Sequence, residues 1–159
     1  MITSITDFNL HSYNTFRINA KCRELIEYTS SDDLPSVMRM VGDRPFVNIG
    51  AGSNMLFTEN FDGVVLHSRI LDISSVAVGK DKMLLRVGAG VVFDDLIQQC
   101  AGSGLWGIEN LSGIPGEAGA AAVQNVGAYG VEVCDVLQKI ECYDVQTGSY
   151  VTFSKDDCG

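Results

Sequence analysis

The apolar positions in the first third of the chain predict a strand, a helix and a second strand. The run 25–29 is typical of a short strand, and the next apolar residues recur at helical spacing, at Leu34, Val37, Met38 and Val41. Hydroxyl and carboxyl groups at 31–33 offer N-cap oxygens, and Gly42 favours the end of the helix. A strand at 46–49 completes a strand–helix–strand lobe, with a parallel strand pair if the crossover is regular.

Farther along, two pairs of apolar runs each flank a short polar turn, which is typical of β-hairpins. The turns are GKDK and QTGS, and a predicted helix at 94–100 lies between the two hairpins in the sequence. The predicted strands of this part are 64–66, 74–78, 83–87, 136–145 and 150–153.

The composition is that of a globular protein without a nucleic-acid footprint. Of the 159 residues, 46% are hydrophobic and 19% are charged, and the net charge is -9. The eleven Lys and Arg residues are scattered singly, so we expect no nucleic-acid partner. An anionic small molecule is still compatible with this charge, because backbone N–H groups can bind it without a cationic side chain.

Cysteine and histidine usage favours a reducing compartment and argues against a metal site. None of the five cysteines forms a C-x-x-C pair, and His11 and His67 are isolated in the sequence. The first residues lack the pattern of a signal peptide, and no apolar run approaches the roughly 20 residues needed to span a bilayer. We therefore expect a cytoplasmic protein without a metal and without membrane association.

The sequence Gly50-Ala-Gly-Ser-Asn follows a predicted strand and is the first candidate binding segment. Gly50 and Gly52 permit positive φ and close approach, and successive N–H groups in such a turn can form an anion nest. Ser53 adds a hydroxyl and Asn54 an amide. The alternative is an ordinary strand-to-loop turn, since the spacing fits neither a P-loop nor a Rossmann fingerprint.

The stretch 114–130, IPGEAGAAAVQNVGAYG, is the second candidate segment. Its small residues would let a flat ligand or a pyrophosphate lie against main-chain N–H groups, with Gln124, Asn125 and Tyr129 as polar partners. The alternative is close packing of one backbone against another. Two such segments in one chain suggest one extended ligand held at both. Glu109 and Glu117 are interpreted as solvated or capping carboxylates.

Four motifs together resemble the UDP-N-acetylenolpyruvoylglucosamine reductase family, whose members are also called UDP-N-acetylmuramate dehydrogenases. They are N-T-F at 14–16, G-x-G-S-N at 50–54, G-x-E-N-L at 107–111 and the run I-P-G to G-A-Y-G at 114–130. The resemblance implies an α+β FAD-binding domain of the vanillyl-alcohol-oxidase, or PCMH, type. It further implies a small strand–helix–strand lobe at 1–66 and a larger antiparallel-sheet lobe at 67–159.

In this family FAD is the cofactor, and the two glycine-rich segments hold its diphosphate and flank the flavin. Carried over residue by residue, the expected FAD contacts are Gly50, Ala51, Gly52, Ser53, Asn54, Met55, Ile114, Pro115, Gly116, Ala120, Ala121, Asn125 and Gly127.

The resemblance also implies a reaction and its partners. In the family, NADPH reduces FAD, and the reduced FAD passes hydride to the enolpyruvyl double bond of a UDP-sugar during peptidoglycan synthesis. A serine protonates the intermediate, and an arginine and a glutamate stabilise it. The protein supplies orientation and electrostatics, and the flavin does the redox work.

Two features depart from the family pattern. Ala120 and Ala121 replace serines of some relatives, so backbone N–H groups would have to substitute for hydroxyl contacts. The family's F-G-Y-R motif with its arginine is expected just after Gly159, and the serine and glutamate farther on, so we expect no catalytic residue in this chain. A helix start at Ser154, with Asp157 three residues later, agrees with this expectation. We therefore expect the flavin-binding portion of a longer reductase, inactive by itself.

Two alternatives remain open at this point. The first is a self-standing FAD or nucleotide-binding module, which a stop codon after Gly159 would favour and continued coding for F-G-Y-R would contradict. The second is a flavin-dependent oxidase of the same fold. Such oxidases often attach flavin through His or Cys, and neither His11 nor His67 lies in a glycine-rich segment.

Overall fold

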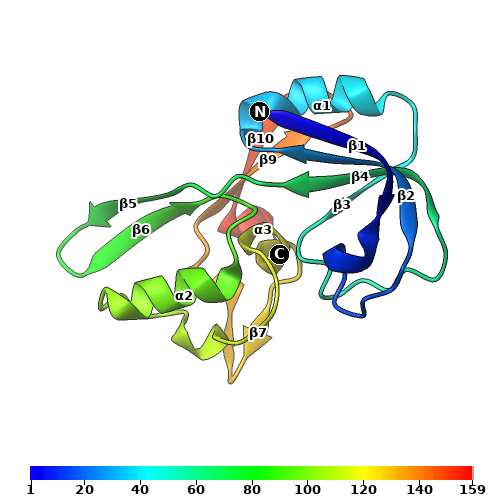
Figure 1. Cartoon of the computed structure of the whole chain (residues 1–159). Coiled ribbons are helices and arrows are strands. Elements are labelled where there is room, and N and C mark those ends of the chain that lie inside the picture. Colours follow the sequence, from blue (N-terminus) through cyan, green and yellow to red (C-terminus); the bar gives the residue numbers. More distant parts are fainter. Residues whose placement is uncertain (159) are drawn as a thin grey trace. The chain divides into compact units, whose positions relative to one another are not determined.

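A mixed four-stranded sheet organises the first half of the chain (Figure 1). The structure is a computed structural model that describes residues 1–158. The strand order is β1-β2-β4-β3, with β1 antiparallel to β2 and with β2 and β3 both parallel to β4. The strands are β1 (Ile2–Asn9), β2 (Lys21–Tyr28), β3 (Phe46–Ile49) and β4 (Phe61–Ser68).

The predicted strand–helix–strand unit is present, but its two strands are not neighbours. Helix α1 (Leu34–Val41) connects β2 to β3, and β4 lies between these two strands in the sheet. The reason is the burial of β4, in which Val64 and Val65 are completely inaccessible to solvent. A strand that is apolar on both faces belongs at the centre of a sheet. The N-terminal strand β1 was not predicted, because most of its residues are exposed and show no apolar alternation.

The core of this half lies on both faces of the sheet. Alternate residues of a strand point to opposite faces, and β2 accordingly sends Ile26 and Tyr28 into one apolar cluster and Leu25 into another. Cys22, which precedes a shift in the register with β4, belongs to the cluster of Leu25. The first cluster includes Val37 and Val41 of α1, so the periodicity of this helix does correspond to a buried face. The second cluster includes Leu10, Ile49 and Val65.

The chain divides into two compact units, Met1–Ile70 and Leu71–Gly159, the second of which is described up to residue 158. The boundary expected between the lobes, after Leu66, lies inside β4. In the structure β4 continues to Ser68, and the boundary between the units follows Ile70. Between them, the two units show the mixed helices and sheets expected for an α+β fold.

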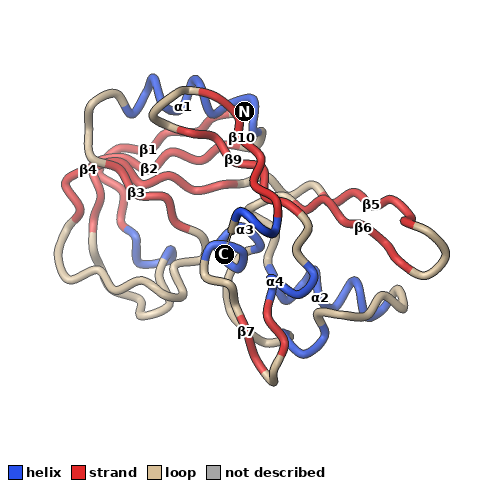
Figure 2. The backbone as a smooth tube through the Cα atoms, turned by 180° about the vertical axis from the view of Figure 1, so that it is seen from behind, coloured by secondary structure: helices blue, strands red, loops and turns tan. Residues whose placement is uncertain are grey.

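Within the described part of the second unit, all paired strands are antiparallel (Figure 2). Both predicted hairpins are present, as β5 (Ile73–Val78) with β6 (Lys82–Val87) and β9 (Lys139–Asp144) with β10 (Ser149–Ser154). The expected strand at 136–145 starts later than predicted, because α4 (Val133–Val136) precedes it. The remaining elements are α2 (Phe93–Gly102), α3 (Ala118–Val123), β7 (Gly127–Ala128) and β8 (Val131–Glu132), with 3-10 turns at Leu10–Tyr13, Ser31–Asp33, Glu109–Leu111 and Lys155–Asp157.

The second unit has its own core, built around α2. Phe93, Leu96, Ile97 and Cys100 of this helix are buried together with Leu111, Ala121 and Val133.

An ion pair between Arg86 and Glu141, 2.7 Å long, joins β6 to β9. Lys139 and Arg86 together lower the pKa of Glu141 to about 2. Among residues 1–158, no helix is long and apolar enough to cross a membrane.

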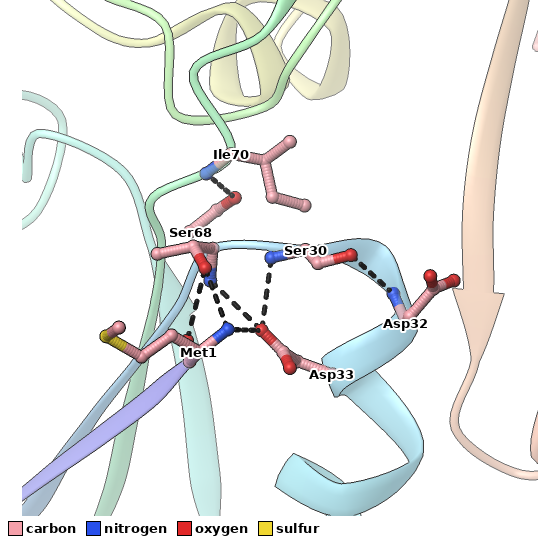
Figure 3. A network of polar contacts seen from close by, with 7 residues as sticks. Met1, Ser30, Asp32, Asp33, Ser68 and Ile70 are labelled. Carbon is pink, nitrogen blue, oxygen red and sulfur yellow. Dashed lines mark hydrogen bonds and ion pairs between the residues drawn. The ribbon is translucent and has the colours of Figure 1, made fainter.

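A polar network ties the first residue of the chain to the start of α1 (Figure 3). The N-terminal ammonium lies 2.7 Å from Asp33 Oδ2 and 2.9 Å from Thr29 Oγ1. Asp33 Oδ2 also accepts from the N–H of Ser30, at 3.1 Å, and Ser30 Oγ accepts from the N–H of Asp32 at 3.1 Å. Ser30 and Asp33 thus form a capping box for the 3-10 turn that leads into α1, so one of the predicted cap residues, Asp33, does contribute a capping oxygen.

We expect Asp33→Asn to reduce stability in a pH-dependent way. The hydrogen bond from the N-terminal ammonium holds the pKa of Asp33 below its ordinary value. A carboxyl whose pKa is lower in the folded state stabilises the fold above its unfolded pKa, about 3.9, and loses this contribution as pH falls through the folded value. Urea unfolding should therefore show a lower free energy for Asp33→Asn at about pH 7, and a difference that shrinks below about pH 4.

Asp32→Asn is the matched control for this experiment, because Asp32 contributes its backbone N–H to the same network. An Asp33→Asn deficit that is equally large at both pH values would contradict the ion-pair interpretation.

Candidate functional site

The first candidate segment, residues 50–55, lies at an edge of the sheet where the parallel strands end. It follows β3 directly, and β2 and β4 run in the same direction as β3. Crevices at the carboxyl ends of parallel strands are the usual ligand sites of open α/β sheets. The place of this segment in the fold therefore suits a binding loop.

Gly52 is the point at which this segment packs against the preceding loop. Its φ is 65°, and a Cβ built on it would overlap the carbonyl oxygen of Tyr13 and lie 3.0 Å from Asn14 Cα. The N–H of Thr15 donates to the carbonyl of Gly52 at 3.3 Å. Glycine is thus needed here for two reasons, its backbone conformation and the contact with Tyr13.

Asn14, the first residue of the N-T-F motif, holds the loop that Gly52 contacts. Its side chain is buried, with 3% of the residue exposed. Its Nδ2 donates to the carbonyls of Leu10, at 2.7 Å, and Ile18, at 3.1 Å, and its Oδ1 accepts from the N–H of Ile18 at 2.9 Å. Asn14 therefore supports the loop against which the first segment packs.

The side chains of this segment are mostly accessible. Ala51 and Asn54 are exposed, Gly50 and Ser53 are half-buried, and Met55 packs against the core cluster that contains Ile49. The segment has no Lys or Arg. An anion bound here would therefore rest on main-chain N–H groups, the Ser53 hydroxyl and the Asn54 amide.

The second candidate segment is more ordered than its sequence suggests. Residues 118–123 form the short helix α3 instead of an open glycine-rich loop. The N–H groups of Ala118 and Gly119 donate to the carbonyls of Val91, at 2.8 Å, and Ala89, at 3.0 Å. The N–H of Ala121 donates to the carbonyl of Glu117. These main-chain donors are occupied within the protein, so they are not an anion nest.

Gly119 lets α3 approach the segment before α2 at backbone distance. A Cβ on Gly119 would lie 2.8 Å from the Cβ of Ala89 and 3.2 Å from both its Cα and its carbonyl oxygen. This is the alternative interpretation of the glycine-rich stretch, the packing of one backbone against another. Ala121 belongs to the same packed region, being 3% exposed in the core of the second unit.

The remaining expected contacts of this segment lie on either side of α3. Before the helix, Ile114 packs against the core, Pro115 is exposed, and the carbonyl of Gly116 accepts from Phe93 N–H. Within and after the helix, Ala120 is half-buried, and Asn125 and Gly127 are exposed.

The side chain of Asn125, just before β7, bonds to the end of β8 and the start of α4. Asn125 has a φ of 43°, its Oδ1 accepts from the N–H of Cys134 at 2.9 Å, and its Nδ2 donates to Glu132 at 2.9 Å. Both ends of the amide group are thus already used within the second unit.

Asp94 was not identified from the sequence, although it bonds to Ser112 and Gly113, the two residues just before the second segment. Its carboxylate accepts from the N–H of Gly113 at 2.7 Å, from Ser112 Oγ at 2.8 Å and from Gln98 Nε2 at 2.7 Å. These donors, Gly113 first, lower the pKa of Asp94. The contact joins residues distant in sequence, so local pattern could not predict it.

The two glutamates near the second segment differ. Glu109 is exposed and accepts from the N–H of Gly107 at 2.5 Å, which lowers the pKa of its carboxyl, as expected of a capping group. Glu117 is 7% exposed and pairs with Val92 in an antiparallel bridge. The prediction of a solvated role is wrong for Glu117, because the residue is buried; it occupies the N-cap position of α3 without a side-chain capping hydrogen bond.

The sequence profile of the FAD binding domain family matches residues 23–154. The chain belongs to this FAD-binding domain family, which confirms FAD as the predicted cofactor. It is 43% identical over 155 residues to the UDP-N-acetylenolpyruvoylglucosamine reductase of Bacteroides fragilis strain YCH46, and 42% identical over 157 residues to that of Porphyromonas gingivalis strain W83. The resemblance inferred from the motifs is thereby confirmed.

These alignments cover 96% of this chain and 46% of each relative, so the chain spans about half the length of the curated relatives it matches. Solved structures agree on the fold. The reductase of Thermus caldophilus superposes with a TM-score of 0.73 at 23% identity, covering 99% of this chain and 53% of that one. The 6-hydroxy-D-nicotine oxidase of Arthrobacter nicotinovorans gives 0.73 at 20% identity, covering 98% and 36%. The predicted fold class is confirmed.

Gly52→Ala should destabilise the chain by at least about 2 kcal/mol. The new methyl group would collide with the Tyr13 carbonyl, and alanine would have to adopt a positive φ. Gly104→Ala is the matched control, since Gly104 has a φ of 71° and an open space around it, and should cost about 1 kcal/mol. Urea unfolding measures both. Equal costs for the two variants would show that the Tyr13 contact does not constrain Gly52.

Gly119→Ala and Gly102→Ala should change stability in opposite directions, although both glycines are helical. Alanine is favoured over glycine in helices by about 1 kcal/mol, and Gly102 has free space around it. At Gly119 the methyl group meets Ala89, and overpacking should cost about 1–3 kcal/mol. Thermal unfolding would contradict the close-packing account if Gly119→Ala were as stable as Gly102→Ala.

Proposed function

We propose that this chain is the FAD-binding portion of a reductase that uses NADPH to convert a UDP-N-acetylglucosamine enolpyruvate to UDP-N-acetylmuramate. One observation carries the proposal, the 43% identity that extends over 96% of this chain to a reductase of that name. The relative is about twice as long, so the remaining catalytic groups are assigned to sequence that this chain does not contain. FAD, when bound, would carry two electrons from NADPH to the enolpyruvyl double bond.

The residues of the first segment fit a diphosphate. The segment follows a strand at the carboxyl edge of parallel strands, and it offers main-chain N–H groups, a hydroxyl and an amide without a basic side chain. We assign the diphosphate of FAD to Gly50, Ala51, Gly52, Ser53, Asn54 and Met55. Their part in the reaction is to hold and orient the cofactor.

The second segment is assigned a different kind of contribution. Its helix α3 has bonded main-chain donors and close backbone packing, so it offers FAD a rigid surface of small side chains. We retain Ile114, Pro115, Gly116, Ala120 and Gly127 as proposed contacts. Asn125 and Ala121 are proposed to act mainly through packing, since the side chain of Asn125 is bonded and Ala121 is buried.

The alternative function is a self-standing FAD module without reductase activity. No observation of the fold favours it over a reductase portion, and both functions predict FAD binding. They differ in the protein that the gene encodes. A coding sequence that continues through F-G-Y-R, and a longer product that turns over the UDP-sugar with NADPH, would support the reductase.

Titration of the folded chain with FAD tests the proposal. We expect flavin fluorescence to change on binding, and Ser53→Ala to raise the dissociation constant about fivefold through the loss of roughly 1 kcal/mol. Ser36→Ala on α1 is the control, since its hydroxyl accepts from Arg39 instead. A folded chain that fails to bind FAD would overturn the proposal. An unchanged constant for Ser53→Ala would remove Ser53 from the site.

A further inference from the structure

A polar cluster of Tyr13, Glu27 and His67 lies at the carboxyl edge of the sheet in the first unit. The hydroxyl of Tyr13 donates to Glu27 Oε1 at 3.0 Å, and His67 Nδ1 lies 2.9 Å from the same oxygen. His67 is 3% exposed, and the side chain of Glu27 is 22% exposed. His67 and Tyr13 thus contact the same carboxylate oxygen of Glu27.

Aromatic contacts fix the geometry of the cluster. The ring of Tyr13 stands edge-on to the imidazole of His67, with 5.2 Å between the ring centroids, and edge-on to Phe8 at 5.3 Å. Arg69 Nε lies 3.9 Å from the shared oxygen of Glu27, and its side chain is half-exposed. Tyr13 is thus held at its ring and at its hydroxyl, which leaves little freedom for its main chain.

This cluster adjoins the first candidate segment in two places. The carbonyl of Tyr13 occupies the space that a side chain on residue 52 would need. In the register of β3 and β4, His67 is the partner of Ile49, the residue just before Gly50. A displacement of Tyr13 or His67 would therefore be transmitted to the segment 50–54 through direct contacts.

We propose that Tyr13, Glu27 and His67 are positioning residues that hold the segment 50–54 in the conformation that binds FAD. The inference rests on the proposed function for its ligand and on the contacts above for its mechanism. Removing one member takes one hydrogen bond from each residue it contacts in this partly buried cluster, and the cluster then relaxes. Because Gly52 lies directly on the Tyr13 carbonyl, the segment moves with it.

Tyr13→Phe and Glu27→Ala test the proposal, with Glu27→Gln as the conservative variant. Phenylalanine keeps the ring contacts and removes the hydroxyl, and glutamine keeps an acceptor oxygen for Tyr13 and His67. We expect the FAD dissociation constant to rise about fivefold in Tyr13→Phe and more in Glu27→Ala. Glu27→Gln should restore most of the affinity lost in Glu27→Ala, and urea unfolding of both variants should show that the affinities are compared on folded protein.

Glu24→Gln is the matched control. Glu24 is a carboxylate of the same strand with 8% exposure, it accepts from Arg44 Nη1 at 2.6 Å, and it pairs with Val64 in mid-sheet. This variant should lower the stability of the first unit and leave the FAD dissociation constant of the folded protein unchanged.

Hydrogen–deuterium exchange without FAD provides a second readout that does not depend on the ligand. The peptide spanning 49–57 should exchange faster in Tyr13→Phe and Glu27→Ala than in the parent chain or in Glu24→Gln. Unchanged exchange in this peptide would overturn the positioning role. If the parent chain bound no FAD, the proposed function would fail, and the exchange data alone would still decide whether the cluster holds the segment. Equal FAD affinities in Glu27→Ala and the parent chain would also overturn the proposal.

Discussion

The close contact between Gly52 and the carbonyl of Tyr13 constrains the whole carboxyl edge of the first sheet. It requires a residue without a side chain and with a positive φ at position 52, and a loop 10–18 that brings the Tyr13 carbonyl to it. The buried side-chain amide of Asn14 holds that loop through three hydrogen bonds, to the main chain of Leu10 and Ile18. The turn that follows β3 is therefore held by main-chain packing at Gly52.

The second glycine-rich stretch shows the same physical principle in a different element. Around Gly119, the absence of a side chain brings α3 against Ala89, and the main-chain donors of the helix are bonded within the unit. Small residues therefore do not imply an accessible backbone. At Gly52 and at Gly119 alike, glycine allows two pieces of backbone to touch.

Local pattern predicted those parts of the fold that depend on nearby residues. Helix α1 and both hairpins follow from periodicity and turn chemistry, and the FAD-binding family follows from four motifs in order. The position of β4 between β2 and β3, and the addition of β1, depend on pairing between distant strands that no local pattern encodes. For the same reason, the bonds of Asp94 to Gly113 and of Tyr13 to Glu27 were visible only in the structure.

A crystal structure of the chain with FAD would test the central claim most directly, since it shows which groups touch the diphosphate. The account predicts diphosphate oxygens within hydrogen-bonding distance of main-chain N–H groups of residues 50–54, with Gly52 still seated on the Tyr13 carbonyl. FAD bound with its diphosphate away from this segment, or a segment rebuilt so that Gly52 leaves Tyr13, would contradict it.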